Sequence, residues 1–562
     1  MRASRAFIKM LEEYGVSHVF GLPGETALPL YSDMRKSSLK HVMARDERNA
    51  AIMADGYART TWRPGVVELP GVGASMALPG LLEARASGVP VIAVVSDVPL
   101  GSERSNTLTE YPKESMFLDA AKEVLKAESP ASLPRLVRRA FRVATTGFPG
   151  PVVLVVPSDV WEGDVDEGEA YAQPRFSSFP SIRFRPSDDD ISAALDLIMK
   201  SQRPVMICGQ GVLFSKAWDE VEELSSLMGM PVGTTISGKG AVSDDNPLSI
   251  GVVGSRGGSS FSNSMVAGAD LVFLVGTNAD SVDTWDWRVP PRGGSQAVIH
   301  LDVSEANLGN MYRTDVFLMG DAKLTLRRMI ELAREKGLSR KRIDVRSERL
   351  ASVSSLQPAV DEGGRGVDPL LLVKALQRSL PDDWVVAVDP GVGAIYTSAF
   401  MEVRKPGRRF LYDYSIGALG FALPAGIGAR LGGPRVLVIT SDGSFGFNAG
   451  ELETVRRLGI DLKIILINNS SFGWINAASA ARYGAALTDE FAEVKYVDVA
   501  RAYGLDAFLA VGNGDLDQLT SFLSSDGPAL MEVRTAPENE LFPPVPDWRE
   551  PASRLGKRYM GV

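Results

Sequence analysis

The chain has 562 residues, of which 45% are hydrophobic and 23% charged, and its formal net charge is −9. This length predicts three or four domains with cores of their own, and the acidic balance argues against a nucleic-acid partner. A single cysteine, Cys208, excludes an intrachain disulfide and a cysteine-based zinc site. No apolar run is long enough to span a membrane, and the first residues lack the apolar core of a signal peptide, so we expect a cytoplasmic protein.

Residues 1–165 alternate helical patterns with short apolar strands, which is typical of a doubly wound α/β domain. Strands are expected at His18–Gly21, Lys40–Ala44, Val66–Leu69 and Pro90–Val95. After the second of these, the run RDERNAAIMADGYART predicts a helix with many small residues. Such a helix can pack closely against another element.

The same alternation returns in residues 188–337 and 366–535. In the former, strands are expected at Pro204–Cys208, Leu271–Val275 and Ala297–Leu301. Residues 536–562, which contain five prolines, follow the last expected strand and are interpreted as a C-terminal lid. The predicted fold class is therefore α/β, with three doubly wound parallel-sheet domains and a C-terminal tail.

The most informative stretch, residues 435–474, reads as a strand, a turn, a helix and a second strand. Asp442 follows the first strand and Asn469 follows the second. Because parallel strands end at one edge of a sheet, where ligands bind, both oxygen-bearing side chains could hold one hard cation. Taken singly, each residue could equally be an ordinary turn or helix cap.

The spacing of 27 residues from Asp442 to Asn469 resembles the GDG-to-NN motif of thiamine-diphosphate (ThDP) enzymes, with Ser441 in place of the first glycine. Other stretches that resemble the same superfamily are VFGLPGE, DERNAAIMADGYAR, PGVGASMALPGLLEARASGVPVIAV, GQGV and IGALGFALPAGIGA. They occur in the order of the pyrimidine-binding, middle and diphosphate-binding domains of the decarboxylase and acetolactate-synthase superfamily. The resemblance is identified as strongest to its 2-hydroxyacyl-CoA lyase members.

This resemblance implies two cofactors, ThDP and Mg²⁺. It assigns the metal to Asp442, the Asn469 side chain and the Ser471 backbone carbonyl. Backbone donors at Gly443 and Ser444 would bind phosphate. For the pyrimidine half, it implies that the Gly417 carbonyl accepts a hydrogen bond from the 4′-amino group and that Leu419 is the wedge that bends the cofactor.

Glu47 follows an expected strand and begins the helix that is rich in small residues. An acid at a helix start is often only a solvated charge that favours the helix dipole. By resemblance, Glu47 would instead bind N1′ of the aminopyrimidine, which allows thiazolium C2 to lose its proton. In the family this glutamate reaches a cofactor held by another subunit, which implies a homo-oligomer, at least a dimer and expected to be a tetramer.

Further acids are candidates because the three histidines, His18, His41 and His300, are too few and poorly placed to shuttle protons. Glu114 stands near a family active-site position. Glu493 precedes an expected helix in a locally apolar stretch that could raise its pKa, and it is a candidate base for a substrate hydroxyl. A first-turn acid that favours the helix dipole is the competing interpretation.

The middle domain binds ADP in some superfamily members, FAD in others and nothing in the rest. Its candidate nucleotide-binding residues are Gly209, Gly211, Lys239, Asp302 and Asp321. Acids at strand ends suit ribose hydroxyls, but they also serve as plain helix caps.

Three functions are weighed. The first is a lyase that cleaves the C1–C2 bond of a 2-hydroxyacyl-CoA to formyl-CoA and an aldehyde or ketone. In its favour, the basic tail residues Arg554, Lys557 and Arg558 could meet the phosphates of an acyl-CoA substrate. The alternatives are an acetolactate-synthase-like carboligase or 2-oxoacid decarboxylase, and a non-catalytic nucleotide-binding scaffold.

Overall fold

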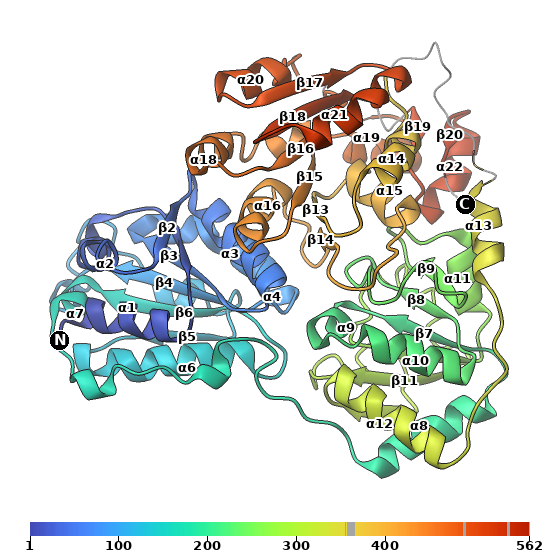
Figure 1. The fold of residues 1–562 in the computed structure, drawn as a ribbon, viewed down its shortest axis with the longest axis horizontal. Coiled ribbons are helices and arrows are strands. Elements are labelled where there is room, and N and C mark those ends of the chain that lie inside the picture. Colours follow the sequence, from blue (N-terminus) through green and yellow to red (C-terminus); the bar gives the residue numbers. More distant parts are fainter. Residues whose placement is uncertain (355, 357–365, 487–490, 537–539, 561–562) are drawn as a thin grey trace. The chain divides into compact units, whose positions relative to one another are not determined.

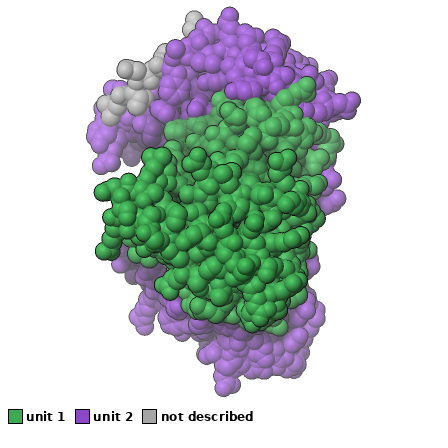
Figure 2. All heavy atoms as spheres, turned by 90° about the vertical axis from the view of Figure 1, so that its left-hand side faces the viewer, with its two compact units in different colours: residues 1–182, 415–436, 447–462 green, residues 183–414, 437–446, 463–562 purple. Residues whose placement is uncertain are grey.

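The computed structural model describes residues 1–354, 356, 366–486, 491–536 and 540–560. The chain divides into two compact units, which Figure 2 colours green and purple. The first unit comprises residues 1–182, 415–436 and 447–462. The second comprises residues 183–414, 437–446 and 463–562.

The first unit is built on a parallel six-stranded sheet in the order β2-β1-β3-β4-β6-β5 (Figure 1). Its strands are β1 (His18–Gly21), β2 (Lys40–Met43), β3 (Gly65–Pro70), β4 (Val91–Asp97), β5 (Glu123–Lys126) and β6 (Val152–Pro157). Its helices are α1 (Ala3–Glu13), α2 (Leu28–Met34), α3 (Glu47–Thr61), α4 (Leu78–Ala86), α5 (Lys113–Met116), α6 (Leu133–Thr145), α7 (Ser158–Glu162), α16 (Ala422–Leu431) and α18 (Glu451–Leu458). β4 and β6 are buried along their whole lengths, which explains their continuous apolar sequences.

Within this unit, α3 packs closely against α16, two helices that lie far apart in the sequence. A Cβ added to Gly56 of α3 would lie 2.2 Å from the Ala425 carbonyl oxygen, and one added to Gly428 would lie 1.9 Å from the Met53 carbonyl oxygen. Only glycine permits backbones to approach so closely. The small residues of both helices therefore bring residues 415–436 against the N-terminal sheet.

The second unit contains two parallel six-stranded sheets. The first has the order β12-β11-β10-β7-β8-β9. Its strands are β7 (Pro204–Cys208), β8 (Val232–Thr234), β9 (Ser249–Val252), β10 (Leu271–Val275), β11 (Ala297–Asp302) and β12 (Val316–Met319). The accompanying helices are α8 (Asp188–Lys200), α9 (Gln210–Ser215), α10 (Trp218–Met228), α11 (Ser260–Ala267), α12 (Ala322–Glu335) and α13 (Arg346–Ser354).

The other sheet of this unit has the order β14-β13-β15-β16-β18-β17. Its strands are β13 (Val385–Val388), β14 (Phe410–Tyr412), β15 (Val436–Ser441), β16 (Lys463–Asn468), β17 (Asp506–Ala510) and β18 (Ala529–Arg534). Its helices are α14 (Pro369–Ser379), α15 (Val392–Phe400), α17 (Asp442–Phe445), α19 (Gly473–Tyr483), α20 (Tyr496–Ala502) and α21 (Leu519–Ser524). The predicted α/β class with three parallel sheets is thus confirmed, whereas the predicted domain limits remain predictions.

The C-terminal segment forms β19 (Leu541–Phe542), α22 (Arg549–Arg554) and β20 (Arg558–Tyr559). Phe542, Trp548 and Ala552 form an apolar cluster with residues of α19. The ring centroids of Trp548 and Trp474 lie 4.4 Å apart. This segment was interpreted from sequence as a lid, and the structure shows it packed on a helix of the second unit. Among the helices of the described residues, none combines the length and apolar character that crossing a bilayer requires.

Candidate active site

Asp442 and Asn469 follow adjacent strands, because β15 pairs with β16 in a register that places Ser441 opposite Ile467. The Gly443 amide donates a hydrogen bond of 2.9 Å to Asp442 Oδ1. The backbone amides of Ser470 and Asn469 lie close enough to this carboxylate to oppose the rise of its pKa. The structure therefore brings Asp442 and the Asn469 loop together, as the strand pattern predicts.

The side chains at this edge of the sheet are suited to bind a cation. Asp442 is only 3% exposed, and its Oδ2 has no hydrogen-bond partner among the described residues. Burial raises the pKa of Asp442 to about 6, because an ionised carboxylate loses its hydration there. A buried carboxylate oxygen without a partner is costly, and a divalent ion would compensate for it. Asp442, Asn469 and Ser471 are the residues that would hold Mg²⁺.

The residues next to Asp442 suit an anion, such as a diphosphate, that would bind the same metal ion. Ser444 lies in α17, and its buried hydroxyl also has no partner among the described residues. A Cβ on Gly443 would lie 3.0 Å from the Phe472 ring, so a larger residue would crowd this turn. Ser471 is buried, and its amide donates to Asn469 Oδ1 at 3.2 Å. The buried, unpartnered hydroxyl of Ser444 suits the diphosphate-binding role proposed for this residue.

Glu47 occupies the first position of α3, and Asp46 caps the helix by accepting a hydrogen bond from the Arg48 amide. A Cβ on Gly73 would lie 1.9 Å from Glu47 Oε1, so this glycine makes room for the carboxyl group. Burial raises the pKa of Glu47. A carboxyl group that retains its proton more readily suits a hydrogen bond to a ring nitrogen, which is its proposed role.

Sequence reasoning did not single out Glu68, a second acid of this unit. Glu68 lies fully buried in β3 and accepts hydrogen bonds from the Tyr31 hydroxyl at 2.5 Å and the Ser96 hydroxyl at 3.1 Å. Burial, assisted by the negative charge of Glu47, raises the pKa of Glu68 to about 8. The signal in the sequence was a glutamate inside an otherwise apolar strand, GVVELP.

Gly417 and Leu419 belong to the same unit as Glu47. The φ angle of Gly417 is +80°, a left-handed conformation that favours glycine. The segment before it is held by the Ile416 amide, which donates to Glu83 Oε2 at 2.9 Å. Leu419 is half-buried. Their assignment to the pyrimidine ring remains a proposal.

In the middle sheet, most of the candidate nucleotide-binding residues have structural partners. Asp321 caps α12 and forms an ion pair with Arg183 at 3.1 Å. Lys239 is buried, lies 3.7 Å from Asp244 and donates to the Ser398 carbonyl at 3.1 Å. The cap interpretation therefore accounts for Asp321, and the ammonium group of Lys239 is already engaged.

Gly209 and Gly211 also have packing roles. A Cβ on Gly209 would lie 2.3 Å from the Gly276 carbonyl oxygen, and one on Gly211 would lie 2.7 Å from the Gly276 Cα. Asp302 accepts a hydrogen bond from the Ser304 amide at 2.8 Å, and burial raises its pKa to about 7. A nucleotide in this domain remains a prediction.

Two further candidate acids, Glu493 and Glu114, both form ion pairs. The expected apolar environment of Glu493 is wrong: its side chain is 68% exposed and forms an ion pair with Arg534 at 3.3 Å. Glu114 is partly exposed and pairs with Lys126 at 2.9 Å. Burial of Glu114 acts to raise its pKa, but the hydrogen bond from Lys126, a backbone hydrogen bond and the positive charges of Lys126 and Lys113 together outweigh it, so the pKa is lowered. Neither acid has the burial that favours a proton-accepting role at neutral pH.

The three basic residues of the tail lie on the packed C-terminal segment. Arg554 is exposed and donates a hydrogen bond to the Ala481 carbonyl at 3.1 Å. Lys557 and Arg558 are exposed. Arg554 therefore helps to attach α22 to α19, and an acyl-CoA role for the three remains untested.

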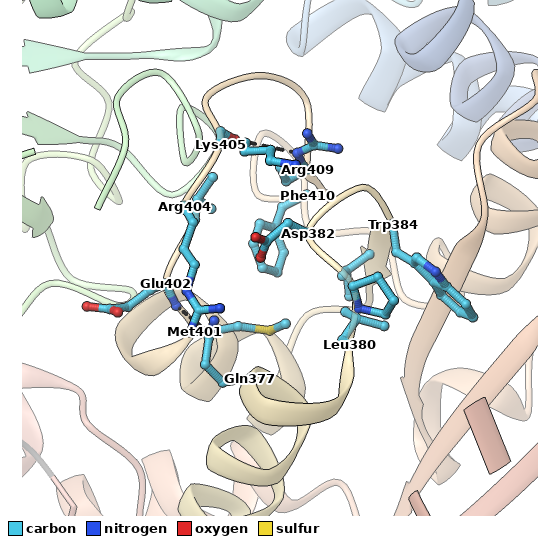
Figure 3. Close-up of a pocket in the computed structure, with 13 residues that line it drawn as sticks. Gln377, Leu380, Asp382, Trp384, Met401, Glu402, Arg404, Lys405, Arg409 and Phe410 are labelled. Atoms are coloured by element: carbon cyan, nitrogen blue, oxygen red, sulfur yellow. Dashed lines mark hydrogen bonds between the residues drawn. The ribbon is translucent and has the colours of Figure 1, made fainter. Parts of the chain in front are cut away.

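Figure 3 shows a cavity of the second unit that none of these candidates lines. Side chains of Gln377, Trp384, Arg404 and Phe410 border it. Its volume of about 30 Å³ is roughly that of one water molecule. It is too small for a substrate.

Three protein-family models match the chain in order. They are the thiamine pyrophosphate enzyme N-terminal TPP binding domain at residues 1–118, the central domain at 191–329 and the C-terminal TPP binding domain at 389–533. Thiamine pyrophosphate (TPP) is the same compound as ThDP. The matched segments together make up well over half of the chain.

Similar proteins extend over nearly the whole length. A probable acetolactate synthase large subunit of Methanocaldococcus jannaschii is 31% identical over 99% of this chain and 94% of its own. An acetolactate synthase of Arthrospira platensis is 31% identical over 98% and 97%. The acetolactate synthase isozyme 2 large subunit of Escherichia coli (strain K12) is 28% identical over 99% and 100%. With three domain matches in order and relatives of full length, this chain belongs to the thiamine-pyrophosphate-dependent enzymes.

Proposed function

We propose that the protein is a carboligase similar to acetolactate synthase, which transfers the acyl unit of one 2-oxoacid to the carbonyl carbon of another. The observation that carries the proposal is the 31% identity to a probable acetolactate synthase large subunit over 99% of the chain. With pyruvate, two molecules would give one acetolactate and one CO₂. The 2-hydroxyacyl-CoA lyase prediction receives no support from these relatives, and they favour the alternative that was set beside it.

Different residues of the chain would bind different parts of the cofactor. When bound, ThDP would supply a carbon nucleophile and a sink for the electrons released by decarboxylation. Glu47 would hold the proton at N1′ of the pyrimidine. Asp442 and Asn469 would hold Mg²⁺, and Ser444 would donate to the diphosphate.

The test is a comparison of substrates with the purified protein, ThDP and Mg²⁺. One panel contains 2-oxoacids and the other 2-hydroxyacyl-CoA esters, and CO₂, 2-hydroxy-3-oxoacids, aldehydes and formyl-CoA are measured. We expect CO₂ and the ligated product from 2-oxoacids, with both absent in Glu47→Gln. Formyl-CoA without turnover of 2-oxoacids would restore the lyase, and CO₂ with free aldehyde alone would indicate a simple decarboxylase.

A further inference from the structure

Arg256 lies in the loop between β9 and α11 of the second unit. Gly254 and Gly257 flank it with φ angles of +97° and +84°. The loop is held in place by Asn263, which accepts a hydrogen bond from the Gly254 amide at 2.9 Å and donates to the Gly254 carbonyl at 3.0 Å. A rigid backbone therefore carries this arginine.

The guanidinium group of Arg256 rests on an aromatic surface. Its central carbon lies 4.5 Å from the centre of the Trp474 ring, and the side chain is half-buried. Burial lowers the pKa of Arg256, and the nearby Asp286 and Asp547 oppose this change. Arginine nevertheless remains charged in proteins, so a permanent cation is held here.

In the part of the chain that the structure describes, no carboxylate forms an ion pair with this cation. Asp547 is instead paired with Arg288 at 2.6 Å. The hydrogen bond that Arg256 makes is a long one, 3.4 Å, to the carbonyl of the adjacent Ser255. A guanidinium group has five N–H donors, so a half-buried one that makes this one hydrogen bond to the described residues can bind an anion.

The surroundings of Arg256 connect it to the candidate cofactor site. Trp474 lies in the first turn of α19, three positions after the proposed metal ligand Ser471. Tyr414, which also interacts electrostatically with Arg256, precedes the proposed pyrimidine contact Gly417 by three positions. Arg256 therefore contacts the helix that follows the proposed metal ligand Ser471, within the second unit.

We propose that Arg256 binds the carboxylate of a 2-oxoacid substrate and so selects acids over uncharged carbonyl compounds. This inference rests on the proposed function. The fork of the guanidinium group matches the two oxygens of a carboxylate, and the Trp474 ring keeps water from one of its faces. The carboxylate could belong to the 2-oxoacid that loses CO₂ or to the one that accepts the acyl unit, and the same chemistry serves both.

The experiment uses the full-length enzyme with ThDP and Mg²⁺, and compares Arg256→Gln and Arg256→Lys with wild type. Arg482→Gln is the matched control, because Arg482 also lies over an aromatic ring, that of Tyr483, but on the exposed surface. Pyruvate and methyl pyruvate are offered as alternative acceptors of the acyl unit, and CO₂ and both ligated products are measured. C2–H/D exchange of bound ThDP reports whether the cofactor site is intact.

We expect wild type to prefer the acid over its ester by about 10²-fold, and Arg256→Gln to lose this preference while H/D exchange stays unchanged. Arg256→Lys should retain part of it, because it keeps the charge without the fork. If CO₂ release falls about 10²-fold as well, the bound carboxylate is that of the donor; if only ligation falls, it is that of the acceptor.

An unchanged preference and unchanged CO₂ release in Arg256→Gln would overturn the inference, as would loss of H/D exchange together with activity. A wild-type enzyme that does not turn over 2-oxoacids would instead overturn the proposed function, and this inference with it.

Discussion

Replacing Gly73 by alanine tests the proposed role of Glu47 without changing Glu47 itself. The new Cβ would lie 1.9 Å from Glu47 Oε1 and 2.5 Å from its Cδ, whereas ordinary contacts are 3.4 to 4 Å. The carboxyl group must therefore move by about 1.5 Å, the difference between 3.4 and 1.9 Å. A misplacement of about 1 Å costs about 10²-fold in rate, so we expect a loss of at least that size.

Folding should be preserved in Gly73→Ala. The group that must move is the end of a flexible side chain, and Gly73 does not have a left-handed φ angle. In the 3₁₀ helix Gly71–Ala77, alanine changes the free energy of unfolding by no more than about 1 kcal/mol. Gly101→Ala is the matched control, because a Cβ there meets nothing within 4 Å.

The assay is C2–H/D exchange of bound ThDP, with urea unfolding measured in parallel. Glu47→Gln should lose about 10²–10⁴-fold of the exchange rate. The double variant Glu47→Gln/Gly73→Ala should lose little more than Glu47→Gln, because both changes remove the same interaction. Near-normal exchange in Gly73→Ala would refute the reasoning that the Glu47 carboxyl group must occupy its present position.

Three further outcomes are expected. Asp442→Ala should lose ThDP on dialysis against a chelator, since the metal loses its carboxylate ligand; stoichiometric ThDP in the dialysed variant would exclude Asp442 as that ligand. Arg59→Met should lower the free energy of unfolding by about 3–5 kcal/mol, because it leaves the buried Asp55 and Glu83 without their cation; a urea midpoint like that of wild type would contradict this. The Glu68 pKa is raised from 4.5 to about 8, so the stability that neutral Glu68 contributes is complete below pH 4.5 and is lost as the pH rises through 8. Glu68→Gln should therefore be less sensitive to pH in urea unfolding between these values, with a difference of ~4 kcal/mol at the upper end; parallel pH curves for the two proteins would show that Glu68 is not held neutral.

Local patterns in the sequence were sufficient for much of the fold. Continuous apolar runs located β7 and β10 at the expected residues, and β2 ended one residue earlier than expected. Buried parallel strands are recognised in this way because both of their faces are covered. That Asp442 and Asn469 follow strands at one edge of a sheet was also predictable, since parallel strands that are adjacent in a sheet end at the same edge.

Properties that depend on burial and on contacts between distant segments could be decided only by the tertiary structure. Glu493 was expected in a locally apolar setting because its sequence neighbours are apolar, yet the fold leaves it exposed beside Arg534. Glu68 lies in an apolar strand, but only its burial and its hydrogen bond from Tyr31 show how far its pKa is raised.

Sequence by itself thus determined the α/β class and the position of several strands along the chain, because these follow from local periodicity. The tertiary structure decided which charges are compensated. It placed the guanidinium group of Arg256 against Trp474, more than two hundred residues away in the sequence. No local pattern predicts such a contact, because it arises only when separate elements pack into one unit and water is removed between them.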